Sequence, residues 1–381
     1  MYKVAIFGCY GIGNLGDDVI MLSLIEKIHE YNPKTRIDIL AYRSEKDLHV
    51  GKKDYVSVTR LYGNFLRKLV IVLNCIKRND GFIIGGGGLF PNESVKNLLK
   101  IYLYSVFANY KKKKIIIHGV EITSAKKNIT KYLWRLILGN VDYFYSRNEF
   151  TLKTLKKLSK KNNVYLGADV TFSIPVNKQV ISMKRYVLLS IAMPWSDYEM
   201  QQQHFKDRYN MLCMQLIKLS EFFIANGYQC MYLPFYENHD DKIIADISKE
   251  LPLEKTIIID WKNLNPMQKR ELFSGAYFAL TMRFHSVLFA IQNGTPFWSI
   301  AYSPKSSNIL KEHKLDNYSE FGIRDTEFFY CEFDIAEKEI IRIKEYFQNI
   351  DDNIRNNIKT VDQELIKLSK NGERLLMKWV K

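Results

Sequence analysis

Residues 265–305 read NPMQKRELFSGAYFALTMRFHSVLFAIQNGTPFWSIAYSPK and alternate between helical and apolar, strand-like segments. Asn followed by Pro is typical of a helix start, and Gly is typical of a helix end. Short apolar runs bounded by such signals predict buried strands. The stretch therefore predicts, in order, a helix from Asn265-Pro266 to about Gly275, a strand over 277–281, a helix over 285–293 ended by Gly294, and a strand over 297–300.

Arg283 and His285 stand where the first of these strands passes into its helix. Ligands of open α/β sheets bind beyond the carboxyl ends of the strands, and a helix N-terminus at that edge attracts anions. Lys305, in the loop after the second strand, belongs to the same edge. We therefore expect Arg283, His285 and Lys305 to bind an anionic ligand.

The alternation of strands and helices continues on both sides of this stretch. Further strands are predicted over 2–8, 36–42, 81–84, 115–118, 143–146, 163–166, 186–192, 229–233 and 256–259, with helices between most of them. Such alternation indicates mostly parallel sheets with helices on both faces. Because 381 residues are too many for one ordinary core, we expect an α/β protein with two Rossmann-like, doubly wound domains that face a cleft.

The domain boundary is predicted where the strand–helix pattern loosens, after Asp169. Residues 1–178 form the N-terminal Rossmann-like domain, with its glycine-rich turns. Residues 179–335 form the C-terminal Rossmann-like domain, which carries the Arg-x-His motif. Residues 336–381 are a helical, basic tail that we expect to pack back across the domains.

The chain is basic, with 56 Lys and Arg against 41 Asp and Glu and a net charge of +15. This excess suits an acidic surface, a phosphorylated substrate or nucleic acid. No apolar run approaches the length of a bilayer span, and the N-terminus reads as a strand and turn. We expect a cytoplasmic protein whose basic surface suits peripheral association with the anionic inner face of a membrane. The five scattered cysteines lack metal-ligand spacing, so we expect reduced thiols and no metal.

Residues 11–16, GIGNLG, match the glycine pattern of dinucleotide-binding proteins. Asp17 and Asp18 follow at once and place negative charge where a pyrophosphate would lie, and the strand over 36–42 ends without the acidic residue that holds a ribose. The sequence therefore disfavours NAD. One of the two aspartates is explained as a helix cap, and the other is a candidate general base for a sugar hydroxyl. We assign the base to Asp17, although the sequence does not separate the pair.

Two further features follow predicted strands in the N-terminal half. Gly85 to Gly88 bring the backbone close to a ligand or to a packed helix, and we favour a ligand-facing loop. Arg147 ends one strand just as Arg283 ends another. Two arginines offered from two domains could clamp one phosphate or carboxylate, whereas the alternative for each is a surface salt bridge.

Together these residues resemble the polysaccharide pyruvyl transferase family. The matching pieces, in the family's order, are Gly13-Asn14-Leu15-Gly16-Asp17, Ile83-Ile84-Gly85-Gly86-Gly87, Ser146-Arg147-Asn148-Glu149, Ala168-Asp169, Arg283-Phe284-His285, and Pro296 to Tyr302 with Lys305. The resemblance implies a fold similar to GT-B glycosyltransferases, and an enzyme of polysaccharide biosynthesis. It also implies phosphoenolpyruvate as donor and co-substrate, a sugar of a cell-surface glycan or its lipid-linked precursor as acceptor, and a pyruvate ketal as product.

The resemblance also implies roles for single residues. Donor binding falls to Arg147, Arg283 and His285, to which we add Lys305 because a small dianion needs several fixed cations. The acceptor side consists of Asn14, Gly16, Asp17, Gly86 and Gly87. Asp17, Arg283 and His285 are the predicted catalytic residues, with His285 either the acid or the ligand of the leaving phosphate.

Two other functions stay open on the sequence. The first is a GT-B-like glycosyltransferase with a nucleotide-sugar donor, which would share the fold and the basic cleft. The second is a non-catalytic protein that binds acidic glycans or nucleic acid. Only the net charge supports it and no nucleic-acid module accompanies the charge, so we do not expect a nucleic-acid partner.

Overall fold

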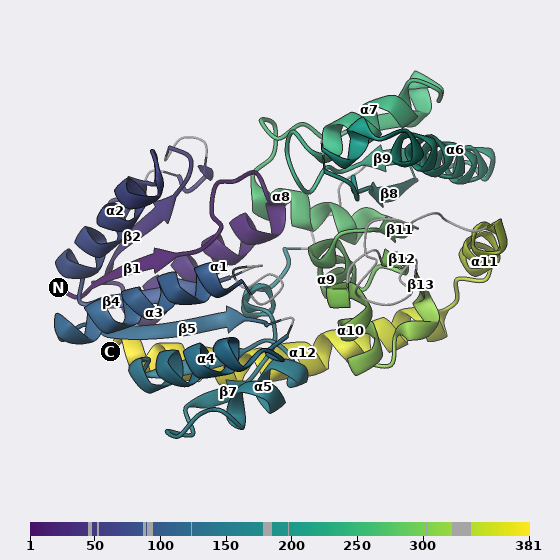
Figure 1. The fold of residues 1–381 in the computed structure, drawn as a ribbon. Coiled ribbons are helices and arrows are strands. Elements are labelled where there is room, and N and C mark those ends of the chain that lie inside the picture. The colour runs from purple at the N-terminus through teal and green to yellow at the C-terminus, as the bar shows by residue number, and fades with distance from the viewer. Residues whose placement is uncertain are drawn as a thin grey trace. The chain divides into compact units, whose positions relative to one another are not determined.

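The computed structural model describes residues 1–44, 48–51, 53–86, 89, 94–122, 124–177, 185–196, 198–301, 304–321 and 337–381. The chain forms two compact α/β units (Figure 1). Unit 1 consists of Met1–Pro175 with Glu364–Lys381, and unit 2 consists of Val176–Gln363. The sequence placed its boundary between residues 178 and 179 and treated the tail from residue 336 as one piece, whereas these units divide the tail at residue 364.

Unit 1 is built on a seven-stranded parallel sheet with the order β3-β2-β1-β4-β5-β6-β7. Its strands are β1 Lys3–Phe7, β2 Arg36–Ala41, β3 Val56–Arg60, β4 Gly81–Gly85, β5 Lys114–Val120, β6 Tyr143–Ser146 and β7 Val164–Leu166. The chain moves outward from β1 to β3 and then returns to the other side of β1 to lay down β4. The carboxyl ends of β1 and β4 therefore mark the topological switch point, where doubly wound sheets bind their ligands.

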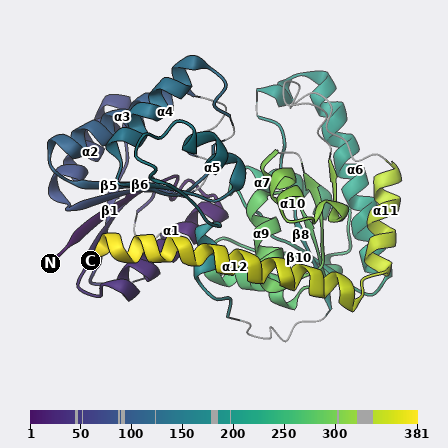
Figure 2. The same cartoon turned by 90° about the horizontal axis from the view of Figure 1, so that it is seen from below.

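Helices cover both faces of this sheet, as Figure 2 shows. They are α1 Leu15–Tyr31, α2 Phe65–Arg78, α3 Val95–Tyr110, α4 Asn128–Asn140, α5 Glu149–Lys156, the 3-10 helix η3 Val170–Ser173 and the end of α12 Asp352–Val380. Helices α2 to α5 pack on one face, where alternate strand residues such as Phe82, Ile117 and Phe144 form a core with them. Helix α1 and the end of α12 lie on the other face.

Unit 2 is built on a six-stranded parallel sheet with the order β10-β9-β8-β11-β12-β13. Its strands are β8 Tyr186–Ser190, β9 Gln229–Tyr232, β10 Thr256–Ile258, β11 Phe278–Thr281, β12 Phe297–Ala301 and β13 Ser319–Phe321. The order repeats that of the first six strands of unit 1, so the switch point lies between β8 and β11. The ends of these two strands are level, because Ser190 pairs with Thr281.

The helices of unit 2 also cover both faces. They are α6 Gln203–Ala225, α7 Asp240–Ser248, α8 Pro266–Glu271, α9 Phe284–Asn293, α10 Pro304–Glu312 and α11 Glu337–Gln348, with 3-10 turns η4 Glu199–Gln201, η5 Leu253–Lys255, η6 Leu272–Gly275 and η7 Asp316–Tyr318. Side chains of α6, α7 and α11 share one core with alternate residues of β8, β11 and β12, including Leu189, Leu280 and Trp298.

The predicted fold class, two Rossmann-like α/β domains, is confirmed by these two sheets. Two strands were missed. One is β13, which has only three residues, and the other is β3, which is short and carries only two apolar residues, Val56 and Val58, among polar ones. Strand β3 is an edge strand that pairs with β2 alone, so it needs no continuous apolar run. No helix in the described part of the chain is long and apolar enough to cross a bilayer.

Candidate functional site

Arg283 lies just beyond β11, at the switch point of unit 2. The Met282 N–H donates to the Ser190 carbonyl at 2.9 Å and extends the strand pairing to this edge. Arg283 is then the N-cap residue of α9. Asn265 caps α8 by accepting from the Gln268 N–H, whereas an arginine side chain has no acceptor atom and cannot cap in this way. Arg283 therefore places a cation at the positive end of the α9 dipole, where a helix favours an anion.

A fully buried carboxylate, Asp240 at the start of α7, holds the Arg283 guanidinium. Arg283 Nε donates to Asp240 Oδ2 at 3.1 Å, and its Nη2 pairs with Oδ1. The same carboxylate accepts backbone N–H groups of Met193 at 3.2 Å, Phe235 at 3.2 Å and Tyr236 at 2.9 Å. Asp240 thus fixes the loops after β8 and β9 and Arg283, which follows β11, against one another.

Burial would raise the pKa of the Asp240 carboxyl, but Arg283 and the hydrogen bonds outweigh burial and hold this pKa below its usual value. Asp240 therefore stays ionised, and it orients Arg283 without exposing its own charge. The Arg283 side chain keeps 19% of its surface exposed and lies over the Tyr236 ring, with its Nη2 3.4 Å from His239 Nδ1. A bidentate pair leaves an arginine little rotational freedom, so its direction is set before any ligand arrives.

Asp240 was not predicted from the sequence. An aspartate in the first turn of a helix is usually explained by the helix dipole, and that ordinary explanation hid its role. The available signal was the position of His239-Asp240 at the carboxyl edge, soon after the buried strand β9.

The other predicted donor residues of unit 2 lie at the same edge. His285 is buried in the first turn of α9, with its ring 6.1 Å from that of Phe289. Lys305, which the sequence placed in a loop, is the second residue of the helix α10, which follows β12, the neighbour of β11. The fold thus brings Arg283, His285 and Lys305 to two adjacent strand ends, as the sequence predicted.

At the switch point of unit 1, the glycine turn after β1 leads into α1. Asn14 caps α1 by accepting from the Gly16 N–H at 3.1 Å. Asp18 Oδ1 accepts from the Gly11 N–H at 3.0 Å and so holds the turn, in which Gly11 has a φ of 70° that favours glycine. Asp17 is buried beside it in the first turn. Asp18 therefore has a structural task in the turn, and the assignment of the base to Asp17 stays a prediction.

Gly85 and Gly86, at the end of β4, are explained by packing. A side chain at Gly86 would bring Cβ to 2.7 Å from an Ile20 methyl group, and Gly86 has a φ of 76°. A Cβ at Gly85 would lie 3.0 Å from Leu24. These contacts join the end of β4 to α1, so packing by itself accounts for both residues. Gly87, also predicted on the acceptor side, lies outside the described residues.

Arg147 is buried in an ion-pair cluster that joins the carboxyl ends of three neighbouring strands. Its Nη2 lies 2.8 Å from Glu121 Oε1 and its Nη1 2.8 Å from Asp169 Oδ2. Asn148 joins the cluster by donating to Glu121 Oε2 at 3.0 Å while capping α5. Burial lowers the pKa of the Arg147 guanidinium, but the two carboxylates raise it above its usual value.

These contacts give the predicted role of Arg147 in donor binding no support. Only 2% of its side chain is exposed and two carboxylates balance its charge. Its placement also differs from that of Arg283: β6 lies two strands away from the switch-point strand β4, whereas β11 is itself a switch-point strand. Arg147 and Arg283 each follow a strand in the sequence, but they do not occupy equivalent places in the two sheets.

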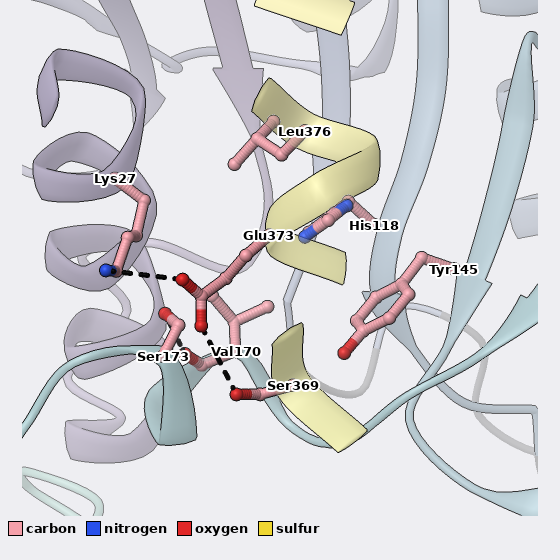
Figure 3. Close-up of a pocket in the computed structure, with 8 residues that line it drawn as sticks. All are labelled: Lys27, His118, Tyr145, Val170, Ser173, Ser369, Glu373 and Leu376. Atoms are coloured by element: carbon pink, nitrogen blue, oxygen red, sulfur yellow. Dashed lines mark hydrogen bonds and ion pairs between the residues drawn. The ribbon is translucent and has the colours of Figure 1, made fainter. Parts of the chain in front are cut away.

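Unit 1 contains a small cavity between α1, β5, β6 and α12 (Figure 3). It is lined by Lys27, His118, Tyr145, Val170, Ser173, Ser369, Glu373 and Leu376, and its volume of about 10 Å³ admits at most one water molecule. Glu373 of α12 points toward Lys27 of α1, with Oε2 3.4 Å from Nζ, and accepts from the Tyr31 hydroxyl at 2.9 Å. The cavity is part of the anchor of α12 on unit 1 and is too small for a substrate.

Solved structures with this fold are similar over nearly the whole chain. The UDP-GlcNAc 2-epimerase of Methanocaldococcus jannaschii is 12% identical, with a TM-score of 0.62 and coverage of 98% of each chain. The UDP-GlcNAc 2-epimerase of Neisseria meningitidis, bound to UDP-GlcNAc, is 13% identical, with a TM-score of 0.57 and coverage of 96% of this chain and 100% of that one. A ugt transferase of Siraitia grosvenorii in complex with UDP is 9% identical, with a TM-score of 0.57 and full coverage of both chains. At such identity the likeness shows the GT-B-type fold alone.

Among curated proteins none matches the chain significantly. The family model described as polysaccharide pyruvyl transferase matches residues 14–304, which is most of the chain. The match begins at Asn14, the cap of α1 in unit 1, and ends at the start of α10 in unit 2, so it spans the switch points of both sheets. The chain belongs to the polysaccharide pyruvyl transferase family.

Proposed function

We propose that this chain transfers pyruvate from phosphoenolpyruvate to a sugar of a cell-surface glycan or its lipid-linked precursor, forming a pyruvate ketal. The observation that carries the proposal is Arg283, held by the buried Asp240 at the switch point of unit 2 and at the N-terminus of α9. A fixed guanidinium at a helix N-terminus suits a small molecule with a carboxylate and a phosphate.

We assign the donor to unit 2 and the acceptor to unit 1. Arg283 and Lys305 supply charge for the two anionic groups, and the positive end of the α9 dipole adds to their attraction. His285, in that turn, either protonates the donor or holds the leaving phosphate. Asn14, Gly16 and Asp17 shape the acceptor side, and Asp17 draws the proton from a sugar hydroxyl. Arg147 keeps a positioning role through Glu121 and Asp169.

The reaction balances without an oxidant or a metal. Protonation of the methylene carbon leaves cationic character on the neighbouring carbon, and one sugar hydroxyl attacks that carbon and loses its proton. The C–O bond to phosphate breaks, and a second hydroxyl of the acceptor closes the ketal as it loses its own proton. One of the two hydroxyl protons replaces the proton taken up by the methylene carbon, and the other leaves with phosphate. The reaction therefore requires one acid, one base and fixed cations from the protein.

Ligand binding tests the proposal against the alternative of a nucleotide-sugar donor. Phosphoenolpyruvate should raise the melting temperature of the protein, whereas UDP- and GDP-sugars should not, because only a ligand of the folded state stabilises it. Stabilisation by a nucleotide-sugar with none by phosphoenolpyruvate would reject the proposal. Mass spectrometry of lipid-linked or free glycans incubated with phosphoenolpyruvate should then reveal a pyruvate adduct and released phosphate.

Variants at the donor side sharpen the test. Removing the Arg283 side chain would leave Asp240 as an unpaired buried charge, so Arg283→Lys is preferable to Arg283→Ala. We expect Arg283→Lys and His285→Ala each to lower turnover at least about a hundredfold, the size typical of removing one transition-state donor. The exposed Arg185, just before β8 at the opposite edge of the sheet, provides the matched control. Near-normal turnover in a folded variant would remove that residue from the mechanism.

A further inference from the structure

Helix α3 of unit 1 is apolar on two sides. Its inward side buries Leu98, Ile101, Tyr104 and Ala108 against the sheet. Its outward side carries a second apolar stripe at helical spacing, exposed by 45%, 46%, 42% and 74%: Leu99, Leu103, Val106 and Tyr110. A helix of a soluble protein normally turns polar residues outward, so this second stripe calls for a partner.

The two neighbouring helices extend the stripe. Helices α2, α3 and α4 lie side by side on one face of unit 1 (Figure 2). Leu66 and Val70 of α2 are 67% and 55% exposed, and Ile129 and Tyr132 of α4 are 49% and 55% exposed. We call these four residues, with the outward stripe of α3, the outer apolar face.

The helices that bear this face carry charge of one sign. Together α2, α3 and α4 contain eight Lys and Arg and no Asp or Glu. Residues 64–141 hold fourteen basic against three acidic residues, a net charge of +11, whereas the whole chain has +15. Some of the ammonium groups lie over aromatic rings: Lys96 is 5.7 Å from the Phe65 ring centroid, and Lys111 is 4.5 Å from that of Tyr110.

We propose that the outer apolar face binds the surface of an anionic lipid bilayer. Amphipathic helices with exposed Leu, Val and Tyr and a basic surround insert their apolar side chains at the headgroup boundary, while Lys and Arg pair with anionic headgroups. A second copy of this chain is a disfavoured partner. Two such faces in contact would bring the eight basic residues of one copy against the same eight of the other, and like charges repel. Nucleic acid would leave the leucine and valine side chains without a suitable partner.

The placement of the face adds a consequence that rests on the proposed function. Helices that follow parallel strands begin at the carboxyl edge of the sheet, so the N-terminal ends of α2, α3 and α4 lie at the edge where β1 and β4 end. The acceptor-side residues, among them Asp17, belong to that edge. A bilayer bound to this face would therefore keep a lipid-linked sugar near the edge that receives it.

Vesicle flotation of the full chain tests the proposal without donor or acceptor, so its outcome is independent of the proposed function. The protein should float with vesicles of phosphatidylcholine and phosphatidylglycerol, and only weakly with phosphatidylcholine alone. Leu99→Ser/Leu103→Ser should weaken binding to the anionic vesicles about tenfold or more. The control Met211→Ser/Met214→Ser, which changes two exposed side chains of α6, should leave binding unchanged.

A second pair of variants tests the charge. Lys131→Gln/Arg135→Gln on α4 should also weaken binding about tenfold or more, because each basic group near an anionic surface adds affinity. Lys160→Gln/Lys161→Gln, which removes the same charge from an exposed loop before β7, should have a much smaller effect. All four double variants should keep the wild-type circular dichroism spectrum.

Several results would overturn the proposal. They are absence of flotation with anionic vesicles, equal flotation with neutral ones, or equal losses in the test and control variants. Self-association of the protein that Leu99→Ser/Leu103→Ser abolishes would instead assign the face to a second copy. Duplex DNA that displaces the vesicles and whose own binding survives Leu99→Ser/Leu103→Ser would assign it to nucleic acid.

Discussion

Replacing Asp240 with Asn should weaken phosphoenolpyruvate binding even though it removes a negative charge from the donor side. If Asp240 acted only through its charge, its loss should tighten binding of a dianion, by on the order of 1–3 kcal/mol for nearby charges at an effective dielectric of about 20. Asp240 instead orients Arg283 through two charge-assisted contacts. The two roles therefore predict opposite changes in affinity: Asp240→Asn weakens phosphoenolpyruvate binding if Asp240 positions Arg283, and strengthens it if Asp240 acts only through its charge.

The size of the effect follows from the contacts that are lost. Hydrogen bonds to charged groups are worth about 1.5–3 kcal/mol. An Arg283 guanidinium that is no longer oriented by the Asp240 carboxylate should therefore bind the donor roughly 10- to 100-fold more weakly. Stability should fall as well. Asn offers one acceptor oxygen where Asp240 serves three backbone N–H groups and Arg283. Breaking a buried ion pair costs about 3–5 kcal/mol, and since Arg283 is partly exposed we expect the lower end, about 3 kcal/mol.

The assay is calorimetric titration with phosphoenolpyruvate well below the melting temperature of the variant. Asp241→Asn is the matched control: it removes the same charge from the same helix turn, where Asp241 accepts from the Asn238 N–H at 2.6 Å. Asp241→Asn should leave binding unchanged or slightly tighter. A tighter complex with Asp240→Asn would refute the positioning role. Equal weakening in both variants would show that Asp240 does not act on phosphoenolpyruvate binding through Arg283.

Two predictions concern unit 1. His118 is buried and its pKa is lowered to about 3, so the folded state resists its protonation and His118 makes stability fall as the pH drops from about 6.5 toward 3. Between pH 8 and pH 5 this costs about 2 kcal/mol, and urea unfolding of His118→Phe should show that much less loss over the same range; an unchanged profile would contradict the burial argument. Arg147→Met should destabilise unit 1 by about 3–5 kcal/mol because it strands Glu121 and Asp169, and neutralising all three residues should recover much of that loss. Wild-type stability of Arg147→Met would show that this ion-pair cluster does not stabilise unit 1.

Elements whose cause is local could be predicted from the sequence. The helix start at Asn265-Pro266, the end of α9 at Gly294 and the apolar strands on either side of α9 each depend on signals a few residues apart. Ligands gather at the carboxyl edge of parallel strands, so Arg283, His285 and Lys305 could be placed at one edge before any coordinates. The ordered motifs also indicated the family that the family model confirms.

The partners of these residues depend on which strands become neighbours, and strand order is a property of the sheet. The sequence presented Arg147 and Arg283 as equivalent, each at the end of a strand. The sheets place β11 at a switch point and β6 two strands beyond one, and they bring Glu121 and Asp169 to Arg147 but Asp240 to Arg283. The sequence by itself determined which residues stand at strand ends, because that depends on local signals; only the tertiary structure decided which buried carboxylate each arginine meets, because those contacts join residues 22 to 43 positions apart.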